Sequence, residues 1–225
     1  MDYKKIEDET RRLQFEIWSQ RQIIFPSGAS PLQMFRPDIA ARVLDVEYEI
    51  RPFIPSSDLT RKAAGQFDRK RGIISVSAEF SYEVQRFTGS HEVGHLLLHP
   101  EIGDGVAHRE VPIGGNSPDY KRPWFEKEAD YFAACFLAPA RQVVEAFRAR
   151  FGEEPLHLDD HSAFYLAGKQ GRLLATAQPG SLRFGSAVAE AGYFGGPRFK
   201  PLAEIFGLTP MAMAIRLREL GLLAE

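Results

Sequence analysis

The stretch His91-Glu92-Val93-Gly94-His95 decides the interpretation of this sequence, because its two histidines have the spacing of one helical turn. Residues 82–99 around it favour a helix that Pro100 ends. Side chains at positions i and i+4 share one face of a helix, so His91 and His95 can reach the same metal ion. Zinc suits them, since it prefers tetrahedral sites with nitrogen, sulfur and oxygen ligands. The segment is therefore expected to be a metal-binding helix.

Glu92, next to the first histidine, is the expected general base. A zinc ion makes water acidic, and a neighbouring carboxylate can accept the proton that the water loses. Three fixed positions are a weak signal alone, and the alternative interpretation is a pair of satisfied core histidines. The apolar residues 96–98 that follow place the motif in a helix that enters a core. Two imidazoles and a carboxylate would be costly there without a function.

A catalytic zinc needs a third protein ligand and an open fourth position. Glu126 is the preferred third ligand, because it begins the next predicted helix, residues 124–137. The alternative interpretation of Glu126 is a solvated acid, which is common at helix N-termini. Asp130 follows one turn later on the same face, where it could accept the free ring N–H of a ligating histidine.

Three other side chains remain alternative ligands. Glu128 lies about 200° around the helix from Glu126 and is the fallback. His99 lies a further turn along the first helix, too far to share the metal comfortably. His108 is in a Gly- and Pro-bearing loop over residues 101–122 that could bend back. The oxyanion of a hydrolytic reaction needs a further donor as well, and the candidates are His108, Tyr120, Tyr131 and His161.

The two segments together resemble the ImmA/IrrE metallopeptidases. That family pairs HExxH with E-x-x-A-[ND]-x-F-A-x-x-[LF]-[LM]-x-P, and residues 126–139 of this chain read EKEADYFAACFLAP. The second segment is far more specific than the first, and the resemblance spans roughly residues 30–145. Asp130 stands where the family usually has Asn, and Ala138 where it usually has Met before the proline. Neither difference touches the chemistry.

The resemblance implies an α+β, zincin-like core in which a small antiparallel sheet packs on the two ligand helices. It implies zinc, with manganese as the alternative, on His91, His95 and Glu126, and a catalytic Glu92. Members of the family are site-specific endopeptidases that act on helix-turn-helix repressors of phages, mobile elements or stress responses, so a protein substrate of that kind is expected. The competing hypotheses are a metal-binding transcription regulator and a repressor-binding protein without proteolysis.

Residues 1–150 are expected to form this metallopeptidase domain. Further helices are predicted over residues 3–22, 31–44 and 140–150. Alternating apolar and polar residues predict a strand over 46–50. Residues 65–68 and 73–77 flank a basic turn at 69–72, which is typical of an antiparallel hairpin with a solvated tip.

Residues 151–225 are expected to form a helical C-terminal region that ends in a helix-turn-helix pattern over 199–223, with Thr209 as the N-cap of its last helix. Arg216 and Arg218 could contact phosphates or bases there. However, the basic and acidic residues balance over residues 199–225, so this segment lacks the electrostatic footprint of a DNA reader. A packing or substrate-docking role is therefore favoured over DNA contact.

The composition fits a cytoplasmic globular protein. The chain has 225 residues and a formal net charge of −2, unlike a dedicated nucleic-acid binder. Its one cysteine, Cys135, excludes an internal disulfide and is interpreted as a small buried hydrophobic residue. The N-terminal residues are charged, without the apolar stretch of a signal peptide. No window approaches the roughly 20 apolar residues that a bilayer-spanning helix needs, so no membrane partner is expected.

Overall fold

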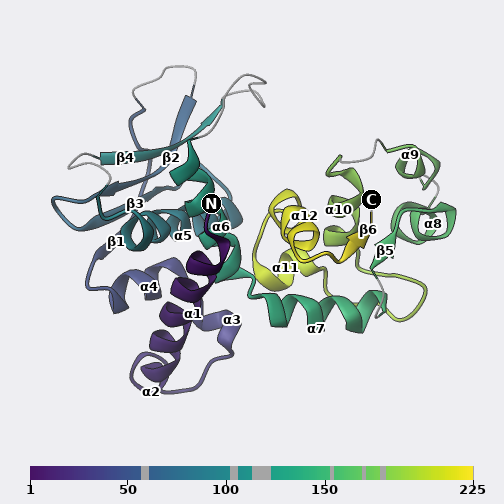
Figure 1. Cartoon of the computed structure of the whole chain (residues 1–225), viewed down its shortest axis with the longest axis horizontal. Coiled ribbons are helices and arrows are strands. Elements are labelled where there is room, and N and C mark those ends of the chain that lie inside the picture. The colour runs from purple at the N-terminus through teal and green to yellow at the C-terminus, as the bar shows by residue number, and fades with distance from the viewer. Residues whose placement is uncertain are drawn as a thin grey trace. The chain divides into compact units, whose positions relative to one another are not determined.

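The computed structural model describes residues 1–56, 61–101, 106–112, 123–152, 155–168, 171–177 and 181–224. The chain forms two compact units, Met1–Leu137 and Ala138–Glu225 (Figure 1). The first unit holds a four-stranded sheet and the helix with the paired histidines, whereas the second is mostly helical. The fold is thus α+β, as expected. The domain boundary predicted after residue 150 stays a prediction.

The helices before the sheet are α1 (Tyr3–Ser19), α2 (Arg21–Ile24), α3 (Pro31–Met34) and α4 (Pro37–Val43). The prediction of a single helix over residues 31–44 is wrong, because the helix is interrupted between α3 and α4. Pro37 begins α4, and Arg36 before it is extended, with φ −127° and ψ 144°. A residue before proline is pushed out of the α region, so one helix cannot run through this point.

The sheet contains β1 (Glu47–Arg51), β2 (Arg61–Asp68), β3 (Ile73–Ser77) and β4 (Val106–Pro112), in the spatial order β1-β3-β2-β4. Antiparallel pairing of β2 with β3 confirms the predicted hairpin. The expectation of a purely antiparallel sheet is wrong, because β1 pairs with β3 in parallel, with Glu47 opposite Ile73. The next strand along the chain after β1 is β2, which is not its neighbour in the sheet. Strand β3 runs antiparallel to β2 and occupies the position between the two, where it is parallel to β1.

Strand β4 corrects the prediction of an irregular loop over residues 101–122. It pairs antiparallel with β2, from Asp68 opposite Val106 to Arg61 opposite Pro112. The sequence of β4 contains three charged or imidazole residues in a row, which hides the apolar alternation that normally marks a strand. Its place in the sheet depends on pairing with a strand far away in sequence, which local patterns do not reveal.

Helix α5 (Tyr82–Leu98), which contains the two histidines, lies against both the sheet and α6 (Trp124–Leu137). Two glycines allow this close packing. A Cβ added at Gly94 would lie 3.2 Å from the Cα atom of Ala129 in α6. A Cβ added at Gly65 in β2 would clash with Cγ2 of Thr88 in α5. Backbone and side-chain atoms therefore hold α5 tightly from both sides.

The second unit contains α7 (Ala140–Phe151), β5 (Leu156–His157), α8 (Asp160–Ala167), α9 (Gly171–Ala175), α10 (Arg183–Glu190), α11 (Leu202–Phe206), α12 (Pro210–Glu219) and β6 (Leu223–Ala224). Helices α11 and α12 lie within residues 199–223, where the helix-turn-helix pattern is predicted. Gly207 ends α11 in the left-handed conformation at φ 58°. The Thr209 hydroxyl accepts a hydrogen bond from the Ala212 amide at 3.2 Å, which is the predicted N-cap.

The two arginines of α12 serve the packing of this unit. Arg216 is only 2% exposed, and its Nε atom donates to the carbonyl of Ala138 at 3.1 Å. Arg218 donates to the carbonyl of Ser181 at 3.1 Å. The idea that Arg216 could contact DNA is therefore wrong, because its guanidinium is buried and engaged within the unit.

Two smaller expectations concern burial and membranes. Cys135 is buried, as the interpretation of a small hydrophobic residue required. Among the helices that the described ranges contain, none has both the length and the apolar character needed to cross a bilayer.

Candidate metal centre

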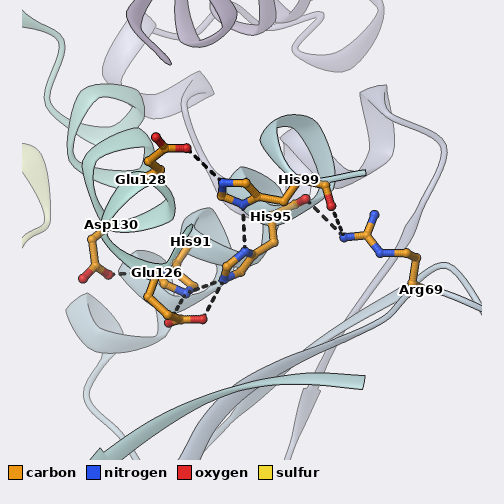
Figure 2. A network of polar contacts seen from close by, with 7 residues as sticks. All are labelled: Arg69, His91, His95, His99, Glu126, Glu128 and Asp130. Atoms are coloured by element: carbon orange, nitrogen blue, oxygen red, sulfur yellow. Dashed lines mark hydrogen bonds and ion pairs between the residues drawn. The ribbon is translucent and has the colours of Figure 1, made fainter. Parts of the chain in front are cut away.

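The three side chains predicted as ligands meet at one point of the first unit (Figure 2). Helix α5 presents His91 and His95, and the Nε2 atoms of their rings are 3.0 Å apart. The first turn of α6 presents Glu126, whose two carboxylate oxygens each lie 3.2 Å from one of these Nε2 atoms. Among the described residues, these three form the only group of His, Cys, Asp or Glu side chains whose ligand atoms lie close enough together to hold one metal ion.

Burial and charge give these groups the protonation states that a metal needs. His91 is fully buried and His95 nearly so. Burial lowers the pKa of His95 by more than the hydrogen bond to Glu126 raises it, which favours the neutral imidazole. Burial alone would raise the pKa of Glu126, but its interactions with both histidine rings outweigh burial, and the pKa is well below its usual range. The donor set is thus two imidazoles and a carboxylate.

Asp130 lies one turn after Glu126, with Oδ1 2.9 Å from Nδ1 of His91. A carboxylate can only accept a hydrogen bond, so the proton of His91 sits on Nδ1 and the lone pair of Nε2 points into the cluster. This is the contact that a metal-ligating histidine usually makes with its remaining ring nitrogen. The contact fixes both the tautomer and the orientation of the ring.

The arrangement of these ligand atoms is better explained by a cation between them than by contacts within the protein alone. With the proton of His91 on Nδ1, its Nε2 lone pair faces Nε2 of His95 and the carboxylate of Glu126. Acceptors that converge in a buried place repel one another unless a positive charge lies between them. Zinc accepts imidazole and carboxylate ligands in this combination. The residues present are therefore suited to hold a zinc ion.

Glu92, the expected general base, is fully buried on α5 beside His91. Its carboxylate faces the central strand of the sheet, since a Cβ added at Gly65 in β2 would lie 3.4 Å from Oε1 of Glu92. The glycine leaves room for this carboxylate between α5 and β2. The carboxylate therefore lies in an enclosed position between α5 and β2, one residue along the helix from His91.

Among the oxyanion-donor candidates, the two whose side chains the structure describes have other partners. The Tyr131 hydroxyl donates to Oε1 of Glu7 in α1 at 2.8 Å. His108 is opposite Gln66 in the register of β4 with β2, and its side chain is outside the described parts, as is Tyr120. His161 belongs to α8 of the second unit, where its ring packs against Tyr165. The assignment of this donor stays a prediction.

Near the cluster lie three further residues whose positions the sequence did not predict. His99 is not a ligand in the cluster; its Nδ1 atom lies 3.1 Å from Nδ1 of His95. Glu128, the fallback ligand, instead contacts Nε2 of His99 at 3.1 Å. Arg69, from the turn predicted to be solvated, donates to the carbonyls of His95 and His99 at 3.3 and 3.0 Å. The repeated i+4 spacing of the histidines could have signalled the role of His99.

The comparison with known families points to a domain of the metallopeptidase type. Residues 47–155 match the model of the IrrE N-terminal-like domain of the peptidase M78 family. The matched range runs from β1 to the end of α7 and includes Glu92 and all three members of the cluster. The resemblance found in the two motif segments is thereby confirmed. No curated protein and no solved structure matches the chain significantly.

Proposed function

We propose that the protein is a zinc-dependent endopeptidase of the HExxH type, with the metal on His91, His95 and Glu126. Manganese is the alternative metal. The observation that carries the proposal is the convergence of two Nε2 atoms and a carboxylate within 3.2 Å of one another in a buried place. The match of residues 47–155 to a peptidase family model supports the hydrolytic interpretation of this cluster.

The chemistry divides between the metal and the chain. A bound zinc ion would polarise the carbonyl of the scissile peptide and increase the acidity of the attacking water. Glu92 accepts the proton of that water and can return it to the nitrogen of the leaving amine. Asp130 keeps a proton on Nδ1 of His91 throughout, so that Nε2 stays available as a ligand. The net reaction is hydrolysis of one peptide bond.

The proposed substrate is a helix-turn-helix transcription repressor in the cytoplasm, of phage, mobile-element or stress-response origin. This part of the proposal is supported by the resemblance of residues 91–99 and 126–139 to the ImmA/IrrE metallopeptidases. The α11–α12 segment is proposed to pack or to dock the substrate rather than to read DNA, because Arg216 is buried.

A catalytic metal keeps one coordination position open, whereas a purely structural metal is closed by protein ligands. A closed centre would need a fourth protein ligand, and His99 was one candidate for that position. Both ring nitrogens of His99 are engaged elsewhere, with His95 and Glu128. Among the described side chains, this removes His99 as a fourth ligand, which supports the peptidase over a transcription regulator with a closed zinc site; the side chain of His108, the other candidate, lies outside the described parts.

The general base provides the decisive test. Purified wild-type protein, Glu92→Gln and the control Glu83→Gln, which carries the same change on the same helix, should be loaded with zinc. Each is then incubated with helix-turn-helix regulators from the same genome, and cleavage is followed by mass spectrometry. We expect Glu92→Gln to bind zinc but not to cleave, and Glu83→Gln to cleave like wild type. Cleavage by Glu92→Gln would refute the mechanism, and an intact regulator in a stable complex with wild type would favour binding without proteolysis.

A further inference from the structure

A second set of polar contacts, separate from that of Asp130, runs as a chain from His95 through His99 to Glu128 (Figure 2). Nδ1 of His95 lies 3.1 Å from Nδ1 of His99, and Nε2 of His99 lies 3.1 Å from Oε2 of Glu128. His99 is only 3% exposed, and the side chain of Glu128 is 15% exposed. The three groups are therefore shielded from water that could replace their hydrogen bonds.

The direction of each hydrogen bond in this chain follows from the carboxylate at its end. Glu128 can only accept, so the proton of a neutral His99 sits on Nε2 and its Nδ1 atom carries a lone pair. That lone pair accepts the Nδ1–H of His95. The remaining lone pair of His95 is then on Nε2, the atom that faces the cluster. The chain thus has one consistent arrangement of protons that prepares His95 as a ligand.

We propose that His99 and Glu128, which we call the His99–Glu128 relay, are positioning residues that set the tautomer and ring orientation of His95 for metal binding. This inference rests on the proposed metal centre. In other metal sites a ligating histidine donates directly to a carboxylate or a carbonyl. Here Asp130 does so for His91, whereas His95 reaches its carboxylate through a second imidazole.

The backbone explains why His99 can turn back toward His95. His99 is not part of the helix but its C-cap, with φ −127° and ψ 51°. Arg69 donates to the carbonyls of both histidines, which holds this end of α5 in place. The ring of Trp124 packs edge-on against His99 with centroids 5.4 Å apart. Arg69 therefore holds the backbone at His99, and Trp124 packs against its ring, which together support the orientation that the relay needs.

The test measures zinc affinity by competition with a chelator, which does not depend on peptidase activity. His99→Leu keeps an apolar side chain in place but removes both hydrogen bonds, and we expect zinc to bind about 10–100-fold more weakly. His99→Gln keeps an acceptor for His95 and a donor for Glu128, so its affinity should return most of the way to wild type. Lys127→Leu, an exposed change on the same turn of α6 as Glu128, is the control and should not differ from wild type.

The visible absorption spectrum of the cobalt-substituted proteins is the second readout, because it reports ligand geometry. It should change in His99→Leu and return toward wild type in His99→Gln. Glu128→Leu should weaken zinc binding in the same direction, and it serves as the variant of choice if His99→Leu does not fold by circular dichroism.

Three results separate the inference from the proposal beneath it. Wild-type affinity in both His99→Leu and Glu128→Leu would overturn the relay while leaving the metal centre intact. Equal losses in His99→Leu and His99→Gln would also overturn the relay, because ring bulk rather than directed hydrogen bonds would then matter. Absence of zinc binding in wild type itself would refute the metal centre, and the relay with it.

Discussion

The two compact units both bury polar side chains, but the partners of these side chains are arranged differently. In the first unit, His91, His95 and Glu126 converge on one point, with their acceptor atoms facing one another. In the second unit, buried Arg216 donates outward to the carbonyl of Ala138 and to Glu219. Convergent acceptors need a ligand, whereas an arginine with separate acceptors is already satisfied. Burial of a polar group therefore indicates function only together with the direction of its partners.

Glu126→Ala should produce the largest effect and should be confined to the first unit. Loss of a direct ligand is expected to weaken zinc binding by more than the roughly 10–100-fold that outer partners contribute. Equilibrium dialysis with metal analysis by mass spectrometry measures this change, and Glu145→Ala, on exposed α7, is the control. Retention of one tightly bound zinc in Glu126→Ala would mean that convergence does not identify the ligands.

Arg216→Leu should lower the stability of the protein and leave its metal binding unchanged. Removing the guanidinium leaves the Ala138 carbonyl without this donor, and we expect the free energy of unfolding to fall by about 2–3 kcal/mol. Zinc affinity should not change. Denaturant unfolding followed by circular dichroism measures the stability, and Arg141→Leu, an exposed arginine on α7, should leave the unfolding midpoint unchanged. A large loss of zinc affinity in Arg216→Leu would show that the comparison is wrong.

Asp130 tests how strictly the first unit depends on directed hydrogen bonds. Asp130→Ala removes the acceptor for His91 and should weaken zinc binding about 10–100-fold. Asp130→Asn keeps a side-chain oxygen that can accept the same N–H, so most of the affinity should remain. Isothermal titration with zinc distinguishes the two variants. Equal affinity in Asp130→Ala and wild type would remove the case for a positioning role of this carboxylate.

The smallest effect is expected at a helix end of the second unit. Thr209→Ala removes the N-cap of α12 and should lower the free energy of unfolding by about 1 kcal/mol. Thr209→Ser keeps the hydroxyl and should restore most of that stability. Neither change should alter zinc affinity, because the residue caps a helix and lies outside the cluster.

The sequence predicts which side chains come together in the cluster, because their positions depend on local helical spacing. His91 and His95 meet at i and i+4, and Asp130 lies one turn after Glu126 within α6. Pairing between distant strands is not encoded in such spacing, which is why the parallel position of β1 and the strand β4 were not foreseen.

The surroundings of His95 were missed for a related reason. A straight helix would place His99 a full turn away from His95, and Glu128 on the far side of α6 from Glu126. The helix instead ends at His99, so its ring can turn back, and Glu128 meets it from α6. Arg69 reaches the same helix end from a hairpin tip that looks solvated in sequence. Each of these contacts depends on where a helix stops and what packs against it.

The hydrogen bonds that hold the two imidazoles also affect the entropy of metal capture. Asp130 fixes the ring of His91, and His99 fixes that of His95, through contacts that do not require the metal. Little rotamer freedom is then left to lose when an ion arrives, so the conformational cost of binding is small. This differs from small zinc domains, in which metal binding and folding are one event. A chelator should accordingly remove zinc from this protein without unfolding it, and the ion should return at a rate set by access and desolvation rather than by refolding.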